Sequence, residues 1–233
     1  MPELHFTAHS GELGGYLSPP LQEGPRAGVI VIQDALGLSD DIRAQADRLA
    51  AAGYLSFAPD LYSGRGIRCV LATLRASRSG SGAAYQDIEA ARALLAARED
   101  CTGRIGIIGF CMGGGFALLC ASSGSFQAAS VNYGEVPRDA GERLASACPI
   151  VGSFGGRDWM LRGRAERLEQ ALSQAGVAHD VKEYPNAGHS FLNHVTTNQF
   201  LTPLVHVGGF GYQGQAAEDA WQRILAFFAE HLD

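Results

Sequence analysis

The sequence lacks long apolar runs and clusters of basic residues. No stretch approaches the roughly 20 apolar residues of a transmembrane helix, and the first ten residues resemble no secretory signal peptide. A net charge of −6 at pH 7, without any Lys or Arg run, argues against nucleic acid or an anionic membrane as a partner. We therefore expect a cytoplasmic monomer or small homo-oligomer that acts on a small molecule.

Motifs for metals and phosphates are also missing. The chain contains no CxxC pair and no HExxH motif, and its glycine-rich segment GFCMGGG lacks the GK[ST] ending of a phosphate-binding loop. Metalloenzyme, kinase and dehydrogenase chemistry thus have little support, so we expect neither metal nor cofactor. The five cysteines cannot all pair with one another, and reduced thiols are the simplest interpretation. Of these thiols, only Cys111 lies at a position suited to a catalytic nucleophile.

The apolar pattern predicts one α/β domain over residues 1–233, a length that can bury a full core. Residues 27–33 form an unbroken β-branched run typical of a strand covered on both faces, and residues 39–53 show helical spacing with an acidic first turn. Because strands and helices continue to alternate, we expect about eight strands in a mostly parallel sheet with helices on both faces. LHFTAH and GGYLSP suggest an additional antiparallel pair at the start.

The remaining elements follow the same alternation. Further strands are predicted at 54–62, at 103–110 and in AASVNYG, CPIVGSFGG and HDVKEYP, and further helices at 85–100, at 112–123 and in RGRAERLEQALSQAG and GQAAEDAWQRILAFFAEHL. Two segments, 64–84 and 192–214, have no firm period. Each follows a predicted strand and contains glycine, so we predict that both are active-site loops.

GFCMGG, residues 109–114, follows a predicted strand and opens a predicted helix. This is the context of the G-x-S-x-G nucleophile elbow of α/β-hydrolases, with Cys111 in place of serine. Gly109 and Gly113 leave space for the backbone of such a sharp turn. The helix N-terminus would stabilise a Cys111 thiolate. The alternative is a glycine-rich turn that holds a buried cysteine.

Two later residues complete a possible catalytic triad. Asp158 follows the predicted strand in PIVGSFGG, and His189 follows the next strand, which gives the chain order of nucleophile, acid and histidine. In this interpretation His189 takes the thiol proton and Asp158 orients the imidazole. An aspartate that caps a turn and a packed histidine are the alternatives.

Backbone N–H groups should bind the oxyanion of the tetrahedral intermediate. The elbow predicts the Met112 N–H as one donor, and the loop IQDALGLSD predicts the Ala35 N–H as the second. Asp34 in the same loop could hold the Cys111 proton in the resting enzyme. The alternative is an acidic residue that only stabilises the start of the next helix, which would give the same sequence pattern.

These segments together resemble the dienelactone hydrolase family, the carboxymethylenebutenolidases of the α/β-hydrolase fold. GFCMGG is similar to the family's elbow, GGRD to its acid loop and AGHSF to its histidine loop, and the resemblance spans nearly the whole chain. It implies a Cys111, Asp158 and His189 triad that cleaves a small ester or lactone through a thioester. It also implies that Tyr133 in NYG lines the pocket, and that the loop after AGVIVIQ supplies an acid for the resting thiol.

The chain departs from the family at its substrate-binding positions. The family's glutamate is Asp34 here, and Asn193 replaces an arginine that grips a substrate carboxylate. Arg68, Arg75 and Arg78 are candidates for a second family arginine, and we take Arg78 as a substrate-binding residue. Two other functions stay open: a carboxylesterase or thioesterase for a larger neutral substrate, and a non-catalytic homologue that binds a ligand.

Overall fold

A computed structural model describes residues 3–63, 73, 81–194 and 211–232. Most of the two predicted active-site loops, 64–84 and 192–214, and the three candidate arginines Arg68, Arg75 and Arg78 lie outside the described residues.

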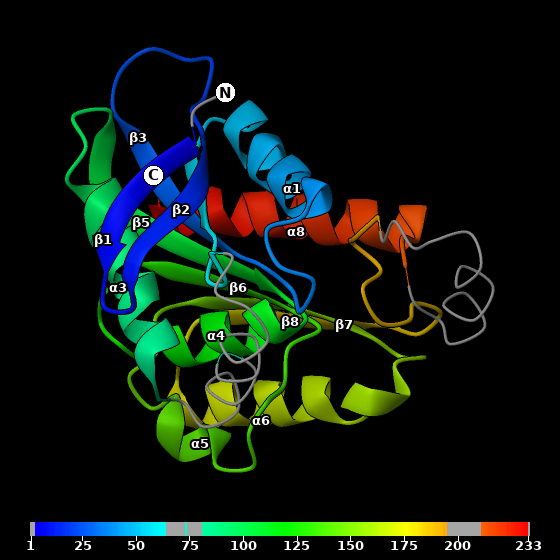
Figure 1. Ribbon diagram of the computed structural model, residues 1–233. Coiled ribbons are helices and arrows are strands. Elements are labelled where there is room, and N and C mark those ends of the chain that lie inside the picture. Colours follow the sequence, from blue (N-terminus) through cyan, green and yellow to red (C-terminus); the bar gives the residue numbers. More distant parts are fainter. Residues whose placement is uncertain (1–2, 64–72, 74–80, 195–210, 233) are drawn as a thin grey trace.

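The described residues form eight strands in one sheet. The strands are β1 (Glu3–Ala8), β2 (Gly11–Ser18), β3 (Arg26–Ile32), β4 (Leu55–Pro59), β5 (Cys101–Phe110), β6 (Ala128–Asn132), β7 (Ile150–Gly155) and β8 (His179–Tyr184). Their order is β1-β2-β4-β3-β5-β6-β7-β8 (Figure 1). β1 pairs antiparallel with β2 and β2 antiparallel with β4, whereas every pair from β4 to β8 is parallel. The predicted mostly parallel sheet and the antiparallel pair at the start are confirmed.

Helices cover both faces of this sheet, as the sequence predicts. They are α1 (Asp40–Ala51), α3 (Ala83–Ala96), α4 (Met112–Cys120), α5 (Ala140–Arg143), α6 (Arg164–Ala175) and α8 (Gly214–Leu232), with a short 3-10 helix η1 (Trp159–Leu161). In Figure 1, α1 and α8 lie on one side of the sheet and α4, α5 and α6 on the other. The start of α1 is fixed by Ser39, whose side chain accepts a hydrogen bond from the Ile42 N–H.

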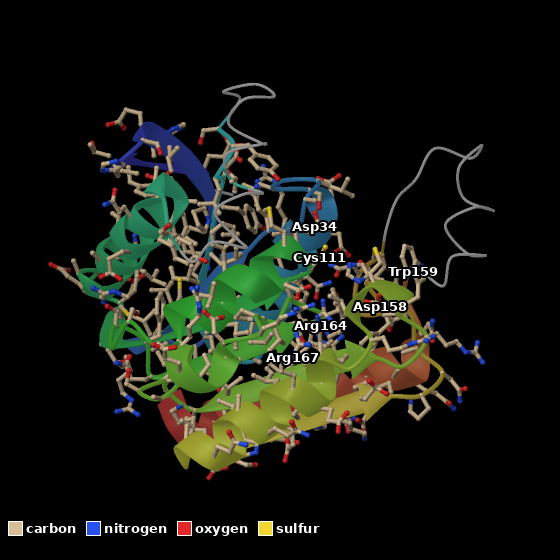
Figure 2. All side chains as sticks on the ribbon, turned by 90° about the horizontal axis from the view of Figure 1, so that it is seen from below. Asp34, Cys111, Asp158, Trp159, Arg164 and Arg167 are labelled. Atoms are coloured by element: carbon tan, nitrogen blue, oxygen red, sulfur yellow. The ribbon has the colours of Figure 1, made fainter. Side chains whose placement is uncertain are left out.

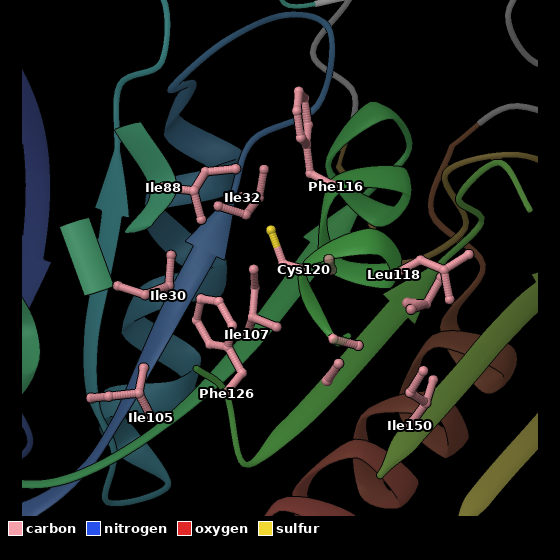
Figure 3. Close-up of a cluster of buried hydrophobic side chains, with 14 of the residues drawn as sticks. Ile30, Ile32, Ile88, Ile105, Ile107, Phe116, Leu118, Cys120, Phe126 and Ile150 are labelled. Atoms are coloured by element: carbon pink, nitrogen blue, oxygen red, sulfur yellow. The ribbon is translucent and has the colours of Figure 1, made fainter. Parts of the chain in front are cut away.

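The central strands are buried on both faces, which explains why their sequences are apolar without interruption. Along β3, Ile30 and Ile32 face the core cluster that includes Phe116 of α4 (Figure 3), whereas Val29 and Val31 face the cluster beneath α1 and α8. All four β3 side chains are fully buried. Each contributes about 1.5 to 3 kcal/mol relative to an exposed side chain, so both faces of the strand stabilise the fold.

The parallel strands also determine where the functional loops lie. β3, β5, β7 and β8 run in the same direction, so their carboxyl ends reach one edge of the sheet. The segments that contain Asp34, Cys111, Asp158 and His189 follow these four ends. This edge is where α/β proteins bind ligands. Within the described part of the chain, no helix has the length and apolar character needed to cross a membrane.

Candidate active site

Cys111 occupies a strained turn between β5 and α4. Its backbone has φ 55° and ψ −114°, a conformation that costs a non-glycine residue on the order of 1 to 3 kcal/mol. Neighbouring backbone groups hold the turn: the Cys111 N–H donates to the Asn132 carbonyl (3.1 Å), and the Gly114 N–H donates to the Cys111 carbonyl (3.0 Å). The thiol is partly exposed at the N-terminus of α4.

The two elbow glycines are required by close backbone contacts. A Cβ atom at Gly109 would lie 1.9 Å from the Gly113 carbonyl oxygen, and one at Gly113 would lie 2.3 Å from the Ile32 carbonyl oxygen of β3. Neither position can accept a side chain unless the backbone moves. The steric interpretation of the GFCMGG spacing is therefore confirmed.

Asp158 and His189 lie in adjacent loops that backbone hydrogen bonds join. The Gly156 N–H donates to the Tyr184 carbonyl (2.8 Å), and the Arg157 N–H donates to the Ala187 carbonyl (2.8 Å). Asp158 begins η1, where its Oδ1 accepts the Met160 N–H (3.1 Å). Its side chain is buried, so the carboxylate is kept from bulk water.

His189 connects the acid to the thiol. Its Nδ1 lies 2.5 Å from Asp158 Oδ2, and the ring is also hydrogen-bonded to the Cys111 side chain. Burial by itself would lower the pKa of His189, but the hydrogen bonds and negative charges of Asp158 and Cys111 outweigh it and raise this pKa to about 9. The structure thus brings the three predicted residues into one hydrogen-bonded chain that favours an imidazolium beside the thiol.

Tyr133 packs against the ring of His189. Its ring centroid is 5.3 Å from that of His189, and its side chain is fully buried. The Tyr133 hydroxyl donates to the Asn193 side chain, and the Asn193 amide donates to Asp41 of α1. A substrate contact by this ring, as predicted, would require it to become exposed. The sequence pattern did not indicate the link from Tyr133 through Asn193 to Asp41.

Asp34 lies in the loop after β3, next to the elbow. It is 8% exposed, and its Oδ1 accepts the Leu36 N–H (2.7 Å). Burial raises the pKa of Asp34, although the Leu36 N–H opposes the shift. Among the described residues, no hydrogen bond joins Asp34 to the Cys111 thiol. Both residues, labelled in Figure 2, follow the carboxyl ends of the parallel strands β3 and β5, and the thiol-holding role of Asp34 stays a prediction.

A polar cavity of about 420 Å³ adjoins this loop. It is lined by Asp34, Leu36, Leu38, Ser39, Asp40, Asp41, Arg43, Asn193 and His194. Three of these are aspartates, and the single arginine lies 3.6 Å from Glu3. Anionic groups would therefore meet like charge on this side of the site.

Large apolar side chains border the site and are exposed. Trp159, which follows Asp158, is 68% exposed, and Leu36, two residues after Asp34 in the same loop, is 69% exposed. Figure 2 places Trp159 beside Asp158 at the molecular surface. Exposed apolar groups at a functional edge are typical of binding surfaces. Their signal in the sequence is an apolar residue within two positions of each loop acid.

Two described arginines near this edge, Arg164 and Arg167, have partners. Arg164 of α6 forms an ion pair with Glu135 (2.9 Å), and Arg167 donates to the Val136 carbonyl (2.8 Å); Figure 2 labels both arginines. The predicted substrate-binding Arg78 lies outside the described residues. In the described segments, no group of three or more His, Cys, Asp or Glu side chains is arranged to hold a metal ion.

The thiols differ in a way that alkylation can measure. Burial raises the pKa of Cys101, Cys120 and Cys148, the last to about 12, whereas the Cys111 thiol is hydrogen-bonded to His189. Limiting iodoacetamide at pH 7 is expected to modify Cys111 on the order of 10²-fold faster than these three, as measured by peptide mass spectrometry. Equal rates at all four positions would contradict a thiol activated by its surroundings.

Comparisons with known proteins identify relatives that match nearly the whole chain. The sequence model of the dienelactone hydrolase family matches residues 13–232. A provisionally named carboxymethylenebutenolidase from Escherichia coli K12 is 31% identical over 91% of this chain and 80% of its own length. Another, from Methylorubrum extorquens, is 27% identical over 98% of this chain and 80% of its own length. The crystal structure of a provisionally named dienelactone hydrolase from Klebsiella pneumoniae is 26% identical, with a TM-score of 0.81 over 99% of this chain and 98% of that one.

Proposed function

The chain belongs to the dienelactone hydrolase family, and on that premise we propose that it cleaves a small ester or lactone with Cys111 as nucleophile. The observation that carries the proposal is the chain of contacts from the Cys111 thiol through His189 to Asp158, with 2.5 Å between His189 Nδ1 and Asp158 Oδ2. Each group has the neighbour that its role requires: an imidazole next to the nucleophile and a buried carboxylate that fixes the imidazole.

The reaction then proceeds in two halves. The Cys111 thiolate attacks the substrate carbonyl carbon, and the tetrahedral intermediate collapses to a thioester when the C–O bond to the alkoxide breaks. His189 gives its proton to the leaving alkoxide. In the second half His189 takes a proton from water, the resulting hydroxide attacks the thioester, and the carboxylic acid is released as Cys111 recovers its thiolate. Asp158 stabilises the imidazolium throughout.

We assign the oxyanion to the N–H groups of Met112 and Ala35. Met112 is the first residue of α4, and N–H groups in a first helical turn lack intrahelical partners. Among the described residues, the Ala35 N–H has no backbone acceptor, and Ala35 is exposed at the site. Two preorganised donors at the developing negative charge would supply a large share of the rate enhancement.

Asp34 has the properties of a proton holder in the resting enzyme. Burial raises its pKa, so it can accept the thiol proton more readily than an exposed aspartate could. We propose that it shares the Cys111 proton when substrate is absent, although its side chain is one methylene shorter than a glutamate.

A neutral ester suits the described part of the site better than an anionic lactone. Asn193 is buried and tied to Tyr133 and Asp41, so it offers no positive charge to a substrate carboxylate. The adjoining cavity carries three aspartates, and exposed Trp159 and Leu36 offer apolar contacts instead. These features favour a carboxylesterase that accepts neutral substrates over a hydrolase restricted to dienelactone.

A matched substrate panel tests the proposal. p-Nitrophenyl acetate is expected to give a kcat/KM about tenfold higher than p-nitrophenyl hydrogen succinate, because an added carboxylate would meet like charge worth on the order of 1 kcal/mol. cis- and trans-Dienelactone and a longer acyl ester complete the panel. During turnover of the acetate, intact-protein mass spectrometry should detect one acetyl group on Cys111.

The other outcomes discriminate among the remaining functions. Preference for dienelactone would overturn the neutral-ester proposal, and a loss confined to anionic substrates in Arg78→Ala would then identify Arg78 as the carboxylate-binding residue. Absence of turnover with every substrate would favour a homologue that binds its ligand without catalysis.

A further inference from the structure

We propose that Tyr62 is a positioning residue that holds the loop carrying the Ala35 oxyanion donor in place. Tyr62 lies three residues beyond the end of β4, and its hydroxyl donates to the Ala35 carbonyl (3.2 Å). The same hydroxyl lies 3.7 Å from the Met112 sulfur. One side chain therefore contacts both residues whose N–H groups are assigned to the oxyanion. This inference rests on the proposed function.

The contact limits the movement of the loop that supplies the Ala35 donor. The peptide group that follows Ala35 is bonded at both of its polar atoms: its carbonyl accepts from Tyr62, and its N–H, which belongs to Leu36, donates to Asp34 Oδ1 (2.7 Å). Rotation of this peptide would break both bonds. Because the Ala35 N–H belongs to the peptide immediately before it, fixing the second peptide restricts the direction in which the Ala35 N–H points.

Tyr62 is itself held in place, as an anchor must be. Its N–H donates to Asp60 Oδ1 (2.9 Å), and the preceding Leu61 N–H donates to the side chain of Gln33 (3.3 Å), the residue before Asp34. Its ring packs against Gly37, where an added Cβ would lie 3.1 Å from the ring. Tyr62 thus contacts the oxyanion loop at Ala35 and Gly37, and the neighbouring Leu61 contacts it at Gln33.

The contacts of Tyr62 should affect the rate of ester hydrolysis because they fix the direction of an oxyanion donor before the reaction begins. An oxyanion donor stabilises the transition state only when it is already directed at the developing charge, and removal of one donor costs roughly 10²- to 10³-fold in kcat. Loss of an anchor loosens a donor without removing it, so its effect should be smaller. Alkylation of Cys111 by iodoacetamide forms no oxyanion. A residue that acts only on the oxyanion site should therefore affect ester hydrolysis and leave alkylation unchanged.

The experiment compares Tyr62→Phe with Tyr16→Phe. The control removes a hydroxyl of the same kind, which donates to Asp47 (2.8 Å), from the contact between β2 and α1. For p-nitrophenyl acetate, Tyr62→Phe is expected to lower kcat on the order of tenfold, below the loss of a whole donor. Its Cys111 alkylation rate, the pH profile of that rate and its Tm should match those of the control.

Other results would overturn the proposal. Unchanged kcat in Tyr62→Phe would remove the positioning role, and an equal loss of hydrolysis and alkylation would mean that Tyr62 acts on the nucleophile or on the fold. Should Tyr62→Phe unfold, the same pair of rates is measured in Tyr62→His, which retains a ring donor and is expected to keep more hydrolysis than Tyr62→Leu. A wild type without Cys111-dependent hydrolysis would instead overturn the proposed function, so the two failures are distinguishable.

Discussion

Cys111→Ala is expected to lower kcat/KM for ester hydrolysis by roughly 10⁴-fold or more, the size of effect seen when a covalent nucleophile is removed. Alanine cannot form the thioester, and what remains is catalysis by the oxyanion donors and by binding. The folded state should persist, because alanine bears the same backbone strain at φ 55° as cysteine does and the change removes only one partly buried sulfur atom. Initial rates with p-nitrophenyl acetate and far-ultraviolet circular dichroism measure the two effects.

Cys148→Ala is the matched control for this substitution. Cys148 is also a free thiol of intermediate exposure, but it packs against the core and precedes β7, at the opposite end of that strand from Asp158. Its replacement should leave kcat/KM unchanged. Cys111→Ser should also lose most turnover, since a hydroxyl is a much weaker acid than a thiol. Full activity in Cys111→Ala would exclude Cys111 as the nucleophile.

Asp158→Asn is expected to lower kcat by about 10²- to 10⁴-fold and to move the basic limb of the pH–rate profile to lower pH. Burial of His189 is the largest influence on its pKa and lowers it, while Asp158 and Cys111 raise the net value to about 9. Without the Asp158 charge, the lowering of the His189 pKa by burial is opposed less, so the imidazolium loses its proton at a lower pH. Because the thiolate is held by the imidazolium, wild-type activity should fall above about pH 9, and activity of the variant should fall earlier.

Asp180→Asn provides the control for the pH measurement. Asp180 of β8 forms an ion pair with Arg223 (2.7 Å) at a half-exposed position, so its loss should leave the limb in place. The profile is recorded as kcat/KM from pH 5 to the limit of enzyme stability, and Cys111 alkylation is followed in parallel. An unshifted limb in Asp158→Asn would show that another group sets the upper pH limit and would remove Asp158 from the orienting role.

The fold was predictable because its signals are local. An unbroken apolar run identified β3, helical spacing identified α1, and the continued alternation identified the later strands and the longer helices; the structure confirms these elements, whereas the short α5 and η1 were not predicted. The elbow was equally readable, since the need for Gly109 and Gly113 comes from contacts within a few residues of Cys111 and with the adjacent β3. The chain order of Cys111, Asp158 and His189 was informative because parallel strands end at the same edge.

The contacts around the three residues were not predictable in the same way. Tyr133 is 60 positions from Asn193, and Asn193 is 152 positions from Asp41. Even so, hydrogen bonds join Tyr133 to Asn193 and Asn193 to Asp41, next to the His189 ring. The sequence indicated only that an arginine is missing at position 193. Similarly, nothing in the segment after β4 indicated that Tyr62 reaches the Ala35 carbonyl.

The sequence by itself determined the α/β architecture, the sharp turn at Cys111 and the order of the residues that meet there. These depend on hydrophobic period and on glycine sterics, which act over a few residues. Only the tertiary structure decided which side chains support the site: Tyr62 beside the oxyanion loop, Tyr133 and Asn193 behind the histidine, and the aspartates of the adjoining cavity. Such contacts depend on how strands pair and which way side chains point between distant segments, and no local pattern in the chain carries that information.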